Sequence, residues 1–194
     1  MNEITRRGLI FGAATAAACG LLAGVERVSI WAFADSDTIE DDPGPVKIVK
    51  FSDDGAWLGI FTLAKVRKNK SEWKKELTPL QYDVTRRAVT EFAFSGALYD
   101  QHALGLYRCV GCGNALFDSK SKFDSGTGWP SFWEPITAEN VREKKDFSMG
   151  VLRTEVKCTL CDAHLGHVFT DGPAPTGLRY CMNSAALLFV PRKS

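Results

Sequence analysis

Residues 107–119 read YRCVGCGNALFDS, and the C-x-x-C pair inside this stretch, Cys109 and Cys112, decides how the chain folds. A second pair with the same spacing, Cys158 and Cys161, lies much further along the chain. A C-x-x-C turn places both sulfurs on one side of a tight loop, and two such loops supply the four thiolates that a tetrahedral zinc ion prefers. The sequence therefore predicts a structural zinc site that joins two distant parts of one fold.

Other uses of these cysteines remain open. Disulfides are the ordinary state of cysteines in an exported protein. A Cys2His2 site is a second alternative, because Cys158, Cys161, His164 and His167 are spaced three residues apart. That set would leave the first cysteine pair without a role. A redox use of either pair is disfavoured because neither pair opens a helix in a βαβ pattern. The four-cysteine zinc site is the favoured prediction.

The chain after Gly105 consists of short apolar and aromatic runs broken by Gly, Pro and Asp. Such runs are typical of strands, and several of them without long helical patterns predict a mainly β domain with antiparallel sheets. The runs are GLYRCV, ALFD, VLRTEVKC, HVFT, GLRYCMN and ALLFV.

Residues 35–70 are expected to form a linker and a β-hairpin. The acidic, proline-containing segment DSDTIEDDPGP at 35–45 suits a flexible linker. The apolar runs at 46–51 and 57–66 flank the turn-forming sequence Asp53-Asp54-Gly55, which is a hairpin pattern.

A helix is expected after this hairpin. Thr78 can cap its first turn, Pro79 suits the first helical position, and Gln81 can reach back as the capping-box partner. The helix should run to about Ala88.

Residues 1–34 have the order of an export signal. Arg6 and Arg7 precede an uncharged stretch from Gly8 to Val25 that is rich in Ala and Gly, and the small-x-small sequence AFA follows at 32–34. This order predicts a twin-arginine (Tat) signal peptide and a periplasmic or extracytoplasmic location. An uncleaved membrane anchor is the alternative, although the stretch is short and weakly apolar for a span. After cleavage no stable membrane association is expected.

The remainder of the chain carries equal numbers of basic and acidic side chains. A neutral domain has no global field that would draw a polyanion, so nucleic acid is not an expected partner. A monomer is the default expectation.

Cys181 is the only cysteine outside the leader and the two pairs. Strand alternation in GLRYCMN places Arg179, Cys181 and Asn183 on one face. An arginine beside a thiol favours the thiolate, which is the nucleophilic form. Cys181 is therefore the candidate nucleophile, with a plain core cysteine as the alternative.

Three more side chains are candidates for the same chemistry. His164 and His167 offer an acid or base that titrates near neutral pH, and Asp171 follows His167 by four residues, so we expect it to orient or charge an imidazole. Both histidines can instead be satisfied structural groups. Trp129, in the loop FDSGTGWPSFW, can form an apolar cradle for a small methyl-bearing substrate, or can simply fill the core.

Four strings of this sequence resemble the methionine sulfoxide reductase B family: YRCVGCGNALFDS, KFDSGTGWPSFW, CDAHLGHVFTDGP and PTGLRYCMNSAAL. The resemblance begins near Ser71 and continues to about Pro191, so residues 71–194 are expected to be the reductase domain. It implies two antiparallel sheets, arranged like a tent, with short N-terminal helices. It also implies one structural zinc held by the four paired cysteines, and reduction of the R epimer of methionine sulfoxide in peptides and proteins.

The resemblance further implies roles for individual residues. Cys181 matches the family nucleophile, and Trp129 matches the residue that packs on the substrate's methyl group. The residues that match the polar surround of the sulfoxide oxygen and the thiolate are His164, His167, Asp171, Arg179 and Asn183. In the implied reaction the His167 imidazolium protonates the sulfoxide oxygen while the Cys181 thiolate attacks sulfur, and Cys181 becomes a sulfenic acid.

One position departs from the family pattern. Many members carry a recycling cysteine where this chain has Thr127. With Cys19 in the leader and four cysteines on zinc, no thiol remains for an internal disulfide with Cys181. We therefore expect an external thioredoxin-like protein to reduce the sulfenic acid.

Two competing functions explain less of the sequence. A non-catalytic zinc-ribbon-like binding module gives no role to Cys181, its flanking Arg179 and Asn183, or the two histidines. A thiol oxidoreductase acting on protein disulfides normally needs two nearby cysteines.

Overall fold

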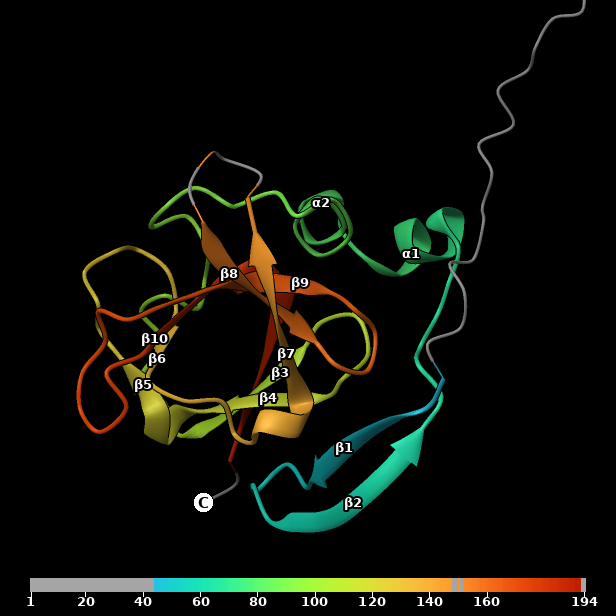
Figure 1. Cartoon of the computed structure of the whole chain (residues 1–194), viewed down its shortest axis with the longest axis horizontal. Helices are drawn as coiled ribbons and strands as arrows, with labels where there is room; N and C mark the ends of the chain where they lie inside the picture. Colours follow the sequence, from blue (N-terminus) through green and yellow to red (C-terminus); the bar gives the residue numbers. More distant parts are fainter. Residues whose placement is uncertain (1–43, 148–149, 151, 193–194) are drawn as a thin grey trace, which may run out of the picture. The chain divides into compact units, whose positions relative to one another are not determined.

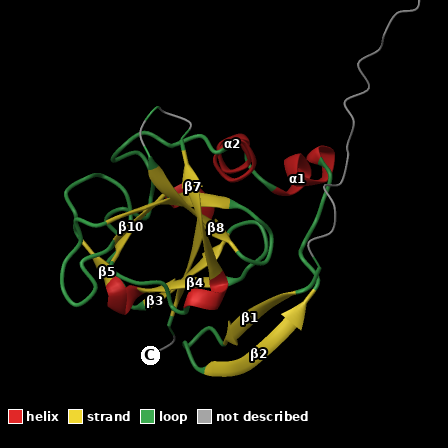
Figure 2. Ribbon diagram, in the orientation of Figure 1, coloured by secondary structure: helices red, strands yellow, loops and turns green. Residues whose placement is uncertain are grey.

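The computed structural model describes residues 44–147, 150 and 152–192, and over these residues the chain is mainly β, with antiparallel sheets, as predicted (Figures 1 and 2). The expected signal peptide at 1–34 and most of the expected linker lie outside the described residues. Among the described residues, neither helix has the length and apolar character that crossing a membrane requires.

The largest sheet has six strands in the order β5-β6-β10-β9-β8-β7. These strands are β5 (Lys122–Phe123), β6 (Ser131–Phe132), β7 (Val141–Asp146), β8 (Arg153–Cys158), β9 (His164–Phe169) and β10 (Arg179–Met182). A three-stranded sheet has the order β11-β3-β4, from β3 (Gly105–Cys109), β4 (Ala115–Asp118) and β11 (Leu187–Pro191). Short 3-10 helices occupy Ser119–Ser121, Ala138–Asn140 and Ser184–Ala186.

Aromatic side chains from these two sheets meet in a common core. Phe117 of β4 stacks on Phe132 of β6 with ring centroids 4.4 Å apart, and Tyr107 of β3 meets Phe132 edge-on at 4.9 Å. All three side chains are fully buried. Such offset and edge-on aromatic pairs add packing energy to the burial of apolar area, so they hold the two sheets face to face.

Strand β7 was not predicted from the sequence. Its residues, VREKKD, are mostly charged and exposed, so they lack the apolar alternation that identifies a strand. Because β7 is an edge strand of the six-stranded sheet, its charges also discourage pairing with another chain.

The predicted hairpin is present as β1 (Val46–Phe51) and β2 (Trp57–Leu63), an antiparallel pair in which Val46 lies opposite Leu63. Its second strand ends three residues earlier than expected. A buried amide ties the hairpin to the domain, because Asn140 bonds the backbone N–H and C=O of Val49, both at 2.8 Å. The same side chain donates to the Ala115 carbonyl of β4.

Two helices precede the sheets: α1 (Lys70–Glu76) and α2 (Pro79–Arg87). Helix α2 has the predicted capping box of Thr78 and Gln81, and it ends at Ala88 in a left-handed conformation. Helix α1 was not located from local signals, although Asn69 and Glu72 form a capping box there as well.

Candidate active site and cysteine cluster

The two C-x-x-C turns have the same local geometry. Each turn closes with a backbone hydrogen bond to its first cysteine: the N–H of Gly113 donates to the Cys109 carbonyl (2.8 Å), and the N–H of Asp162 donates to the Cys158 carbonyl (2.9 Å). Gly113 and Asp162 both have positive φ, 72° and 56°. Glycine adopts this conformation without strain, and aspartate tolerates it better than most residues. The turns therefore present their sulfurs in matching orientations.

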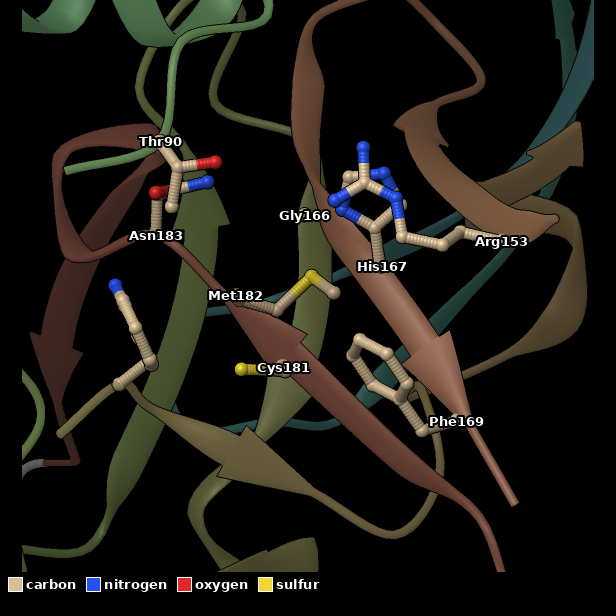
Figure 3. Close-up of a pocket in the computed structure, with 9 residues that line it drawn as sticks. Thr90, Arg153, Gly166, His167, Phe169, Cys181, Met182 and Asn183 are labelled. Atoms are coloured by element: carbon tan, nitrogen blue, oxygen red, sulfur yellow. The ribbon is translucent and has the colours of Figure 1, made fainter. Parts of the chain in front are cut away.

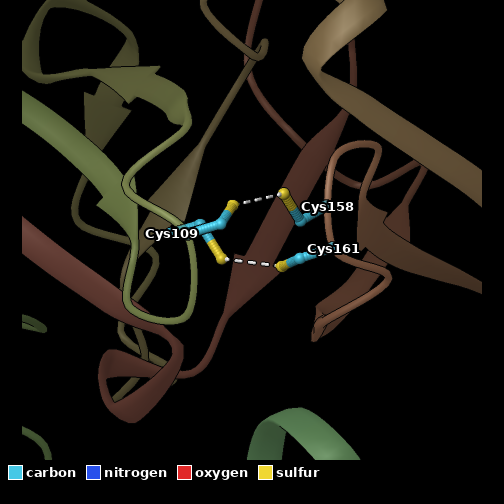
Figure 4. Close-up of side chains that lie close together, drawn as sticks. Cys109, Cys158 and Cys161 are labelled. Carbon is cyan, nitrogen blue, oxygen red and sulfur yellow. Dashed lines mark hydrogen bonds between the residues drawn. The ribbon is translucent and has the colours of Figure 1, made fainter. Parts of the chain in front are cut away.

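The four sulfurs converge at one point (Figure 4). The Sγ atoms of Cys109 and Cys161 lie 3.5 Å apart, those of Cys112 and Cys158 lie 3.6 Å apart, and all four lie within 4.8 Å of one another. No disulfide joins the cysteines of the described residues. Four sulfurs around a tetrahedral ion with metal–sulfur bonds of about 2.3 Å would lie about 3.8 Å apart, so the cluster fits a metal ion of that kind.

The alternative Cys2His2 set is not brought together. The cluster of potential ligands holds the four cysteines and neither His164 nor His167. Each histidine instead bonds a carboxylate, His164 that of Glu155 and His167 that of Asp146.

An arginine from α2 supports the cluster from outside. The Arg86 guanidinium donates to the Cys161 carbonyl at 2.7 Å and approaches the Cys161 sulfur at 3.5 Å. It also stacks on Trp73 of α1, 3.6 Å from the ring centroid. A guanidinium at this distance stabilises the negative charge of a thiolate. Through the same side chain, α1 and α2 are both attached to the cysteine cluster.

Cys181 lies in a separate open pocket of about 480 Å³, built where β8, β9 and β10 run side by side (Figure 3). Of the predicted site residues, the structure places four in its wall: Trp129, His167, Cys181 and Asn183. The full lining is Thr90, Trp129, Arg153, Gly166, His167, Phe169, Cys181, Met182 and Asn183.

Cys181 and His167 lie side by side on neighbouring strands. They are direct partners in the antiparallel β10–β9 pairing. Side chains of such partners lie on the same face of the sheet with Cβ atoms about 5 Å apart, so both line the same pocket. Gly166 makes this approach possible, because a Cβ there would meet the Cys181 carbonyl oxygen at 2.1 Å.

The carboxylate that orients His167 is Asp146, and the expectation that Asp171 does so was wrong. His167 Nε2 lies 2.9 Å from Asp146 Oδ2, and the same oxygen accepts from Arg153 at 2.8 Å. Asp171 instead receives two hydrogen bonds from Arg179, at 2.9 and 2.8 Å. Asp146 was missed because it belongs to β7, the strand that carries no apolar pattern.

The pKa values of Cys181 and His167 move in opposite directions. Burial raises the pKa of the Cys181 thiol, although Arg179 and a hydrogen bond from Thr127 lower it in part. The predicted effect of Arg179 thus has the right sign but is outweighed by burial. Burial also lowers the pKa of His167, although its hydrogen bond to Asp146 acts the other way. At neutral pH the resting pair is therefore a thiol and a neutral imidazole.

Arg179 and Asp171 form an ion pair outside the pocket wall. The Arg179 guanidinium lies 4.5 Å from the centroid of the Phe169 ring, which does line the pocket. Its side chain is largely buried, whereas that of Asp171 is exposed. The pair keeps a positive charge near Cys181.

Trp129 and Asn183 are both held by Glu91, a residue that sequence reasoning missed. The Trp129 indole donates to the Glu91 carbonyl (3.1 Å), and the Glu91 N–H donates to Asn183 Oδ1 (3.0 Å). The buried Glu91 carboxylate accepts from the backbone N–H groups of Ser184 and Ala185. A carboxylate that precedes two exposed aromatic residues, in TEFAF, gives no local signal of this role.

His164 lies behind His167 rather than in the pocket. The two rings are 5.4 Å apart, and His164 Nδ1 bonds Glu155 at 2.8 Å. Its Nε2 atom is buried without a hydrogen-bond partner.

Comparisons with known proteins agree with this architecture. The SelR domain matches residues 77–191, more than half of the chain. The chain therefore belongs to the family of SelR-domain proteins.

Similar proteins carry the name peptide methionine sulfoxide reductase MsrB. The chain is 55% identical to the one from Pseudomonas aeruginosa (strain UCBPP-PA14) over 132 residues, which are 68% of this chain and 100% of that protein. It is 56% identical to the Bradyrhizobium diazoefficiens protein over 128 residues, 66% of this chain and 92% of the relative. It is 57% identical to the Herminiimonas arsenicoxydans protein over 125 residues, which are 64% of this chain and 91% of the relative. The predicted resemblance to the MsrB family is confirmed.

Proposed function

We propose that the chain is a peptide-methionine (R)-S-oxide reductase that acts on oxidised methionine in peptides and proteins, with Cys181 as its nucleophile. The observation that carries this proposal is the pocket in which Cys181, His167 and Trp129 meet, while the four other cysteines of the described residues are held in the cluster. The names of the relatives support the same activity. A non-catalytic binding module leaves this pocket without a use.

The chemistry follows from the opposite pKa shifts of Cys181 and His167. When substrate binds, the proton of the Cys181 thiol moves to His167, which creates the nucleophile and the acid together. The thiolate attacks the sulfoxide sulfur while the imidazolium protonates the sulfoxide oxygen. The hydroxyl group then moves to the Cys181 sulfur as its bond to the methionine sulfur and the transient bond between the two sulfurs both break. Cys181 is thereby oxidised to a sulfenic acid, methionine leaves in its reduced thioether form, and His167 returns to the neutral imidazole.

The remaining predicted residues support this step from fixed positions. Trp129, with Phe169, offers the apolar wall for the methyl group. Arg179, held by Asp171, favours the thiolate as it forms. Asn183 ties the Glu91 segment, which holds the Trp129 indole, to β9: it accepts from the Glu91 N–H and donates to the Leu165 carbonyl. His164 and Glu155 back the His167 ring.

Replacing Cys181 by Ser should abolish reduction of methionine-R-sulfoxide, because the alcohol is a far weaker nucleophile. A racemic methionine-sulfoxide peptide with dithiothreitol is the substrate, and chiral chromatography follows both epimers. The native protein should consume about half of the peptide, the R epimer, and the variant should be slower by a factor on the order of 10³ or more. Consumption of neither epimer by the native protein would favour the binding module, and a fully active variant would exclude Cys181.

The pH dependence of kcat/KM should be a broad bell. Activity is lost when His167 binds a proton in the resting enzyme, below the ordinary imidazole pKa of 6.5, because its pKa is lowered. It is lost again when Cys181 loses its proton in the absence of substrate, above the ordinary thiol pKa of 9.0, because its pKa is raised. Steady-state kinetics from about pH 5 to about pH 10.5 would measure both limbs, because this range spans the ordinary pKa values of an imidazole and a thiol.

Two matched variants separate the limbs of that bell. Asp146→Asn removes the carboxylate that raises the His167 pKa, so the acid limb should move to lower pH. Asp171→Asn removes a charge that raises the Cys181 pKa, so the alkaline limb should move to lower pH instead. Identical shifts in both variants would contradict the assignment of Asp146 to His167.

We also propose that an external thioredoxin-like dithiol protein regenerates Cys181. Thr127 stands where many family members carry a recycling cysteine, and the other described cysteines lie in the cluster. After one turnover without reductant, mass spectrometry should find one added oxygen on Cys181. A disulfide between Cys181 and any other cysteine of the same chain would overturn this regeneration route.

The metal of the four-cysteine cluster is proposed to be one zinc ion per chain, which would stabilise the fold and take no part in the reaction. Four cysteine sulfurs and the tetrahedral spacing suit zinc. Cys158→Ser should lower the zinc content measured by mass spectrometry and lower Tm by roughly 10 °C or more. Cys181→Ser is the matched control and should keep both. Unchanged zinc and Tm in Cys158→Ser would refute the site.

The Tat signal at 1–34, the boundaries of the linker and hairpin at 35–70 and the extracytoplasmic location stay proposals. They fit the cluster, because zinc ligands must be thiolates and an oxidising compartment would convert free cysteines to disulfides. Folding around zinc before export avoids this competition.

A further inference from the structure

Three hydroxyl groups form a continuous chain beside Cys181. The oxygen atoms of Ser131 and Ser125 lie 2.7 Å apart, and those of Ser125 and Thr127 lie 2.8 Å apart. Ser131 is fully buried and is the direct partner of Cys181 in the β6–β10 pairing. At the other end, a side-chain hydrogen bond with Thr127 is among the influences that lower the pKa of the Cys181 thiol. The chain therefore begins at the strand partner of the nucleophile and ends at the nucleophile itself.

The position of the loop that carries Thr127 is fixed by its backbone conformation and by a backbone hydrogen bond. The residues on either side, Gly126 and Gly128, have φ of 69° and 85°, values that glycine adopts without strain. A Cβ on Gly128 would meet the Phe94 backbone nitrogen at 2.6 Å, and the Phe94 N–H donates to the Gly128 carbonyl at 2.9 Å. Thr127 is thus presented to Cys181 by a turn fastened to the segment after α2.

A count of protons shows what this chain can do. Each hydroxyl has one proton to donate. When Cys181 is a thiol, its S–H can donate to Thr127, Thr127 to Ser125, Ser125 to Ser131, and Ser131 to the Trp129 carbonyl at 3.2 Å. When Cys181 is a thiolate, all three hydroxyls can turn the other way, so that Thr127 donates to sulfur. The same three hydroxyl groups serve both states, and only the bond from Ser131 to the Trp129 carbonyl is given up in the thiolate state.

We propose that the Ser131–Ser125–Thr127 chain stabilises the Cys181 thiolate during reduction of methionine sulfoxide, with Thr127 donating to the sulfur. This inference rests on the proposed function, because it assigns a role within that reaction. The other charged or titratable groups around Cys181 come from β8, β9, β10 and the segment between β9 and β10: Arg153, His167, Arg179 and Asp171. The hydroxyl chain acts from the opposite side, through β6 and the loop before it.

Thr127→Val tests the donor, because valine has nearly the same shape and lacks the hydroxyl. Thr127→Ser is the matched control that keeps it. The rate of Cys181 alkylation by iodoacetamide, followed by peptide mass spectrometry from pH 6 to pH 10, reports the thiolate fraction. We expect Thr127→Val to react about tenfold more slowly at pH 8, in line with the loss of one hydrogen bond to a charged group, and Thr127→Ser to follow the native profile.

Ser125→Ala provides an independent measurement if Thr127→Val does not fold. It removes the group that donates to Thr127 in the thiolate state, so Cys181 alkylation at pH 8 should slow by a smaller factor. Native alkylation profiles in both Thr127→Val and Ser125→Ala would overturn the inference. The readout needs no turnover: an inactive native protein would count against the proposed function, whereas an active one with unshifted variants would count against the hydroxyl chain alone.

Discussion

The convergence of two C-x-x-C turns is the constraint on which the rest of the molecule depends. One turn joins the strands β3 and β4 of the smaller sheet, and the other joins β8 and β9 of the larger sheet. Four thiolates within 4.8 Å of one another would repel, so their closeness is favourable only around a cation or with protons between them. The cluster therefore ties the two sheets at one end, while the aromatic core holds them face to face.

The geometry of the Cys181 pocket depends on the four-cysteine cluster. Strand β9 begins three residues after Cys161 and carries His167, and its partner β10 carries Cys181. Because Gly166 lets the β10 backbone come close, the positions of Cys181 and His167 are set by strand register instead of by a mobile loop. Groups built on paired strands keep their separation better than groups on loops, and proton transfer is sensitive to that separation.

Local sequence signals predicted the features that depend on near neighbours: the C-x-x-C turns, the hairpin, the α2 capping box, and the strand alternation around Cys181. Long-range partners were not predictable in this way. Asp171 was expected near His167 because it follows by only four residues, but four residues along an extended chain cover about 13 Å. Asp146 and Glu91 reach the site from distant segments whose composition resembles an exposed surface.

If Cys181 is the nucleophile we propose, the balance of forces around it accounts for how its thiol is protected from oxidation between turnovers. A permanently ionised, accessible cysteine would itself be oxidised by the agents that damage methionine, since susceptibility follows thiolate character. Here burial outweighs Arg179 and Thr127 and keeps the thiol protonated at rest. Burial also keeps His167 neutral and able to accept that proton. In the proposed reaction, Cys181 becomes reactive only when a group in the pocket stabilises the thiolate–imidazolium pair. The polarised S–O bond of a sulfoxide does so, because its oxygen accepts the imidazolium proton while its sulfur accepts the thiolate.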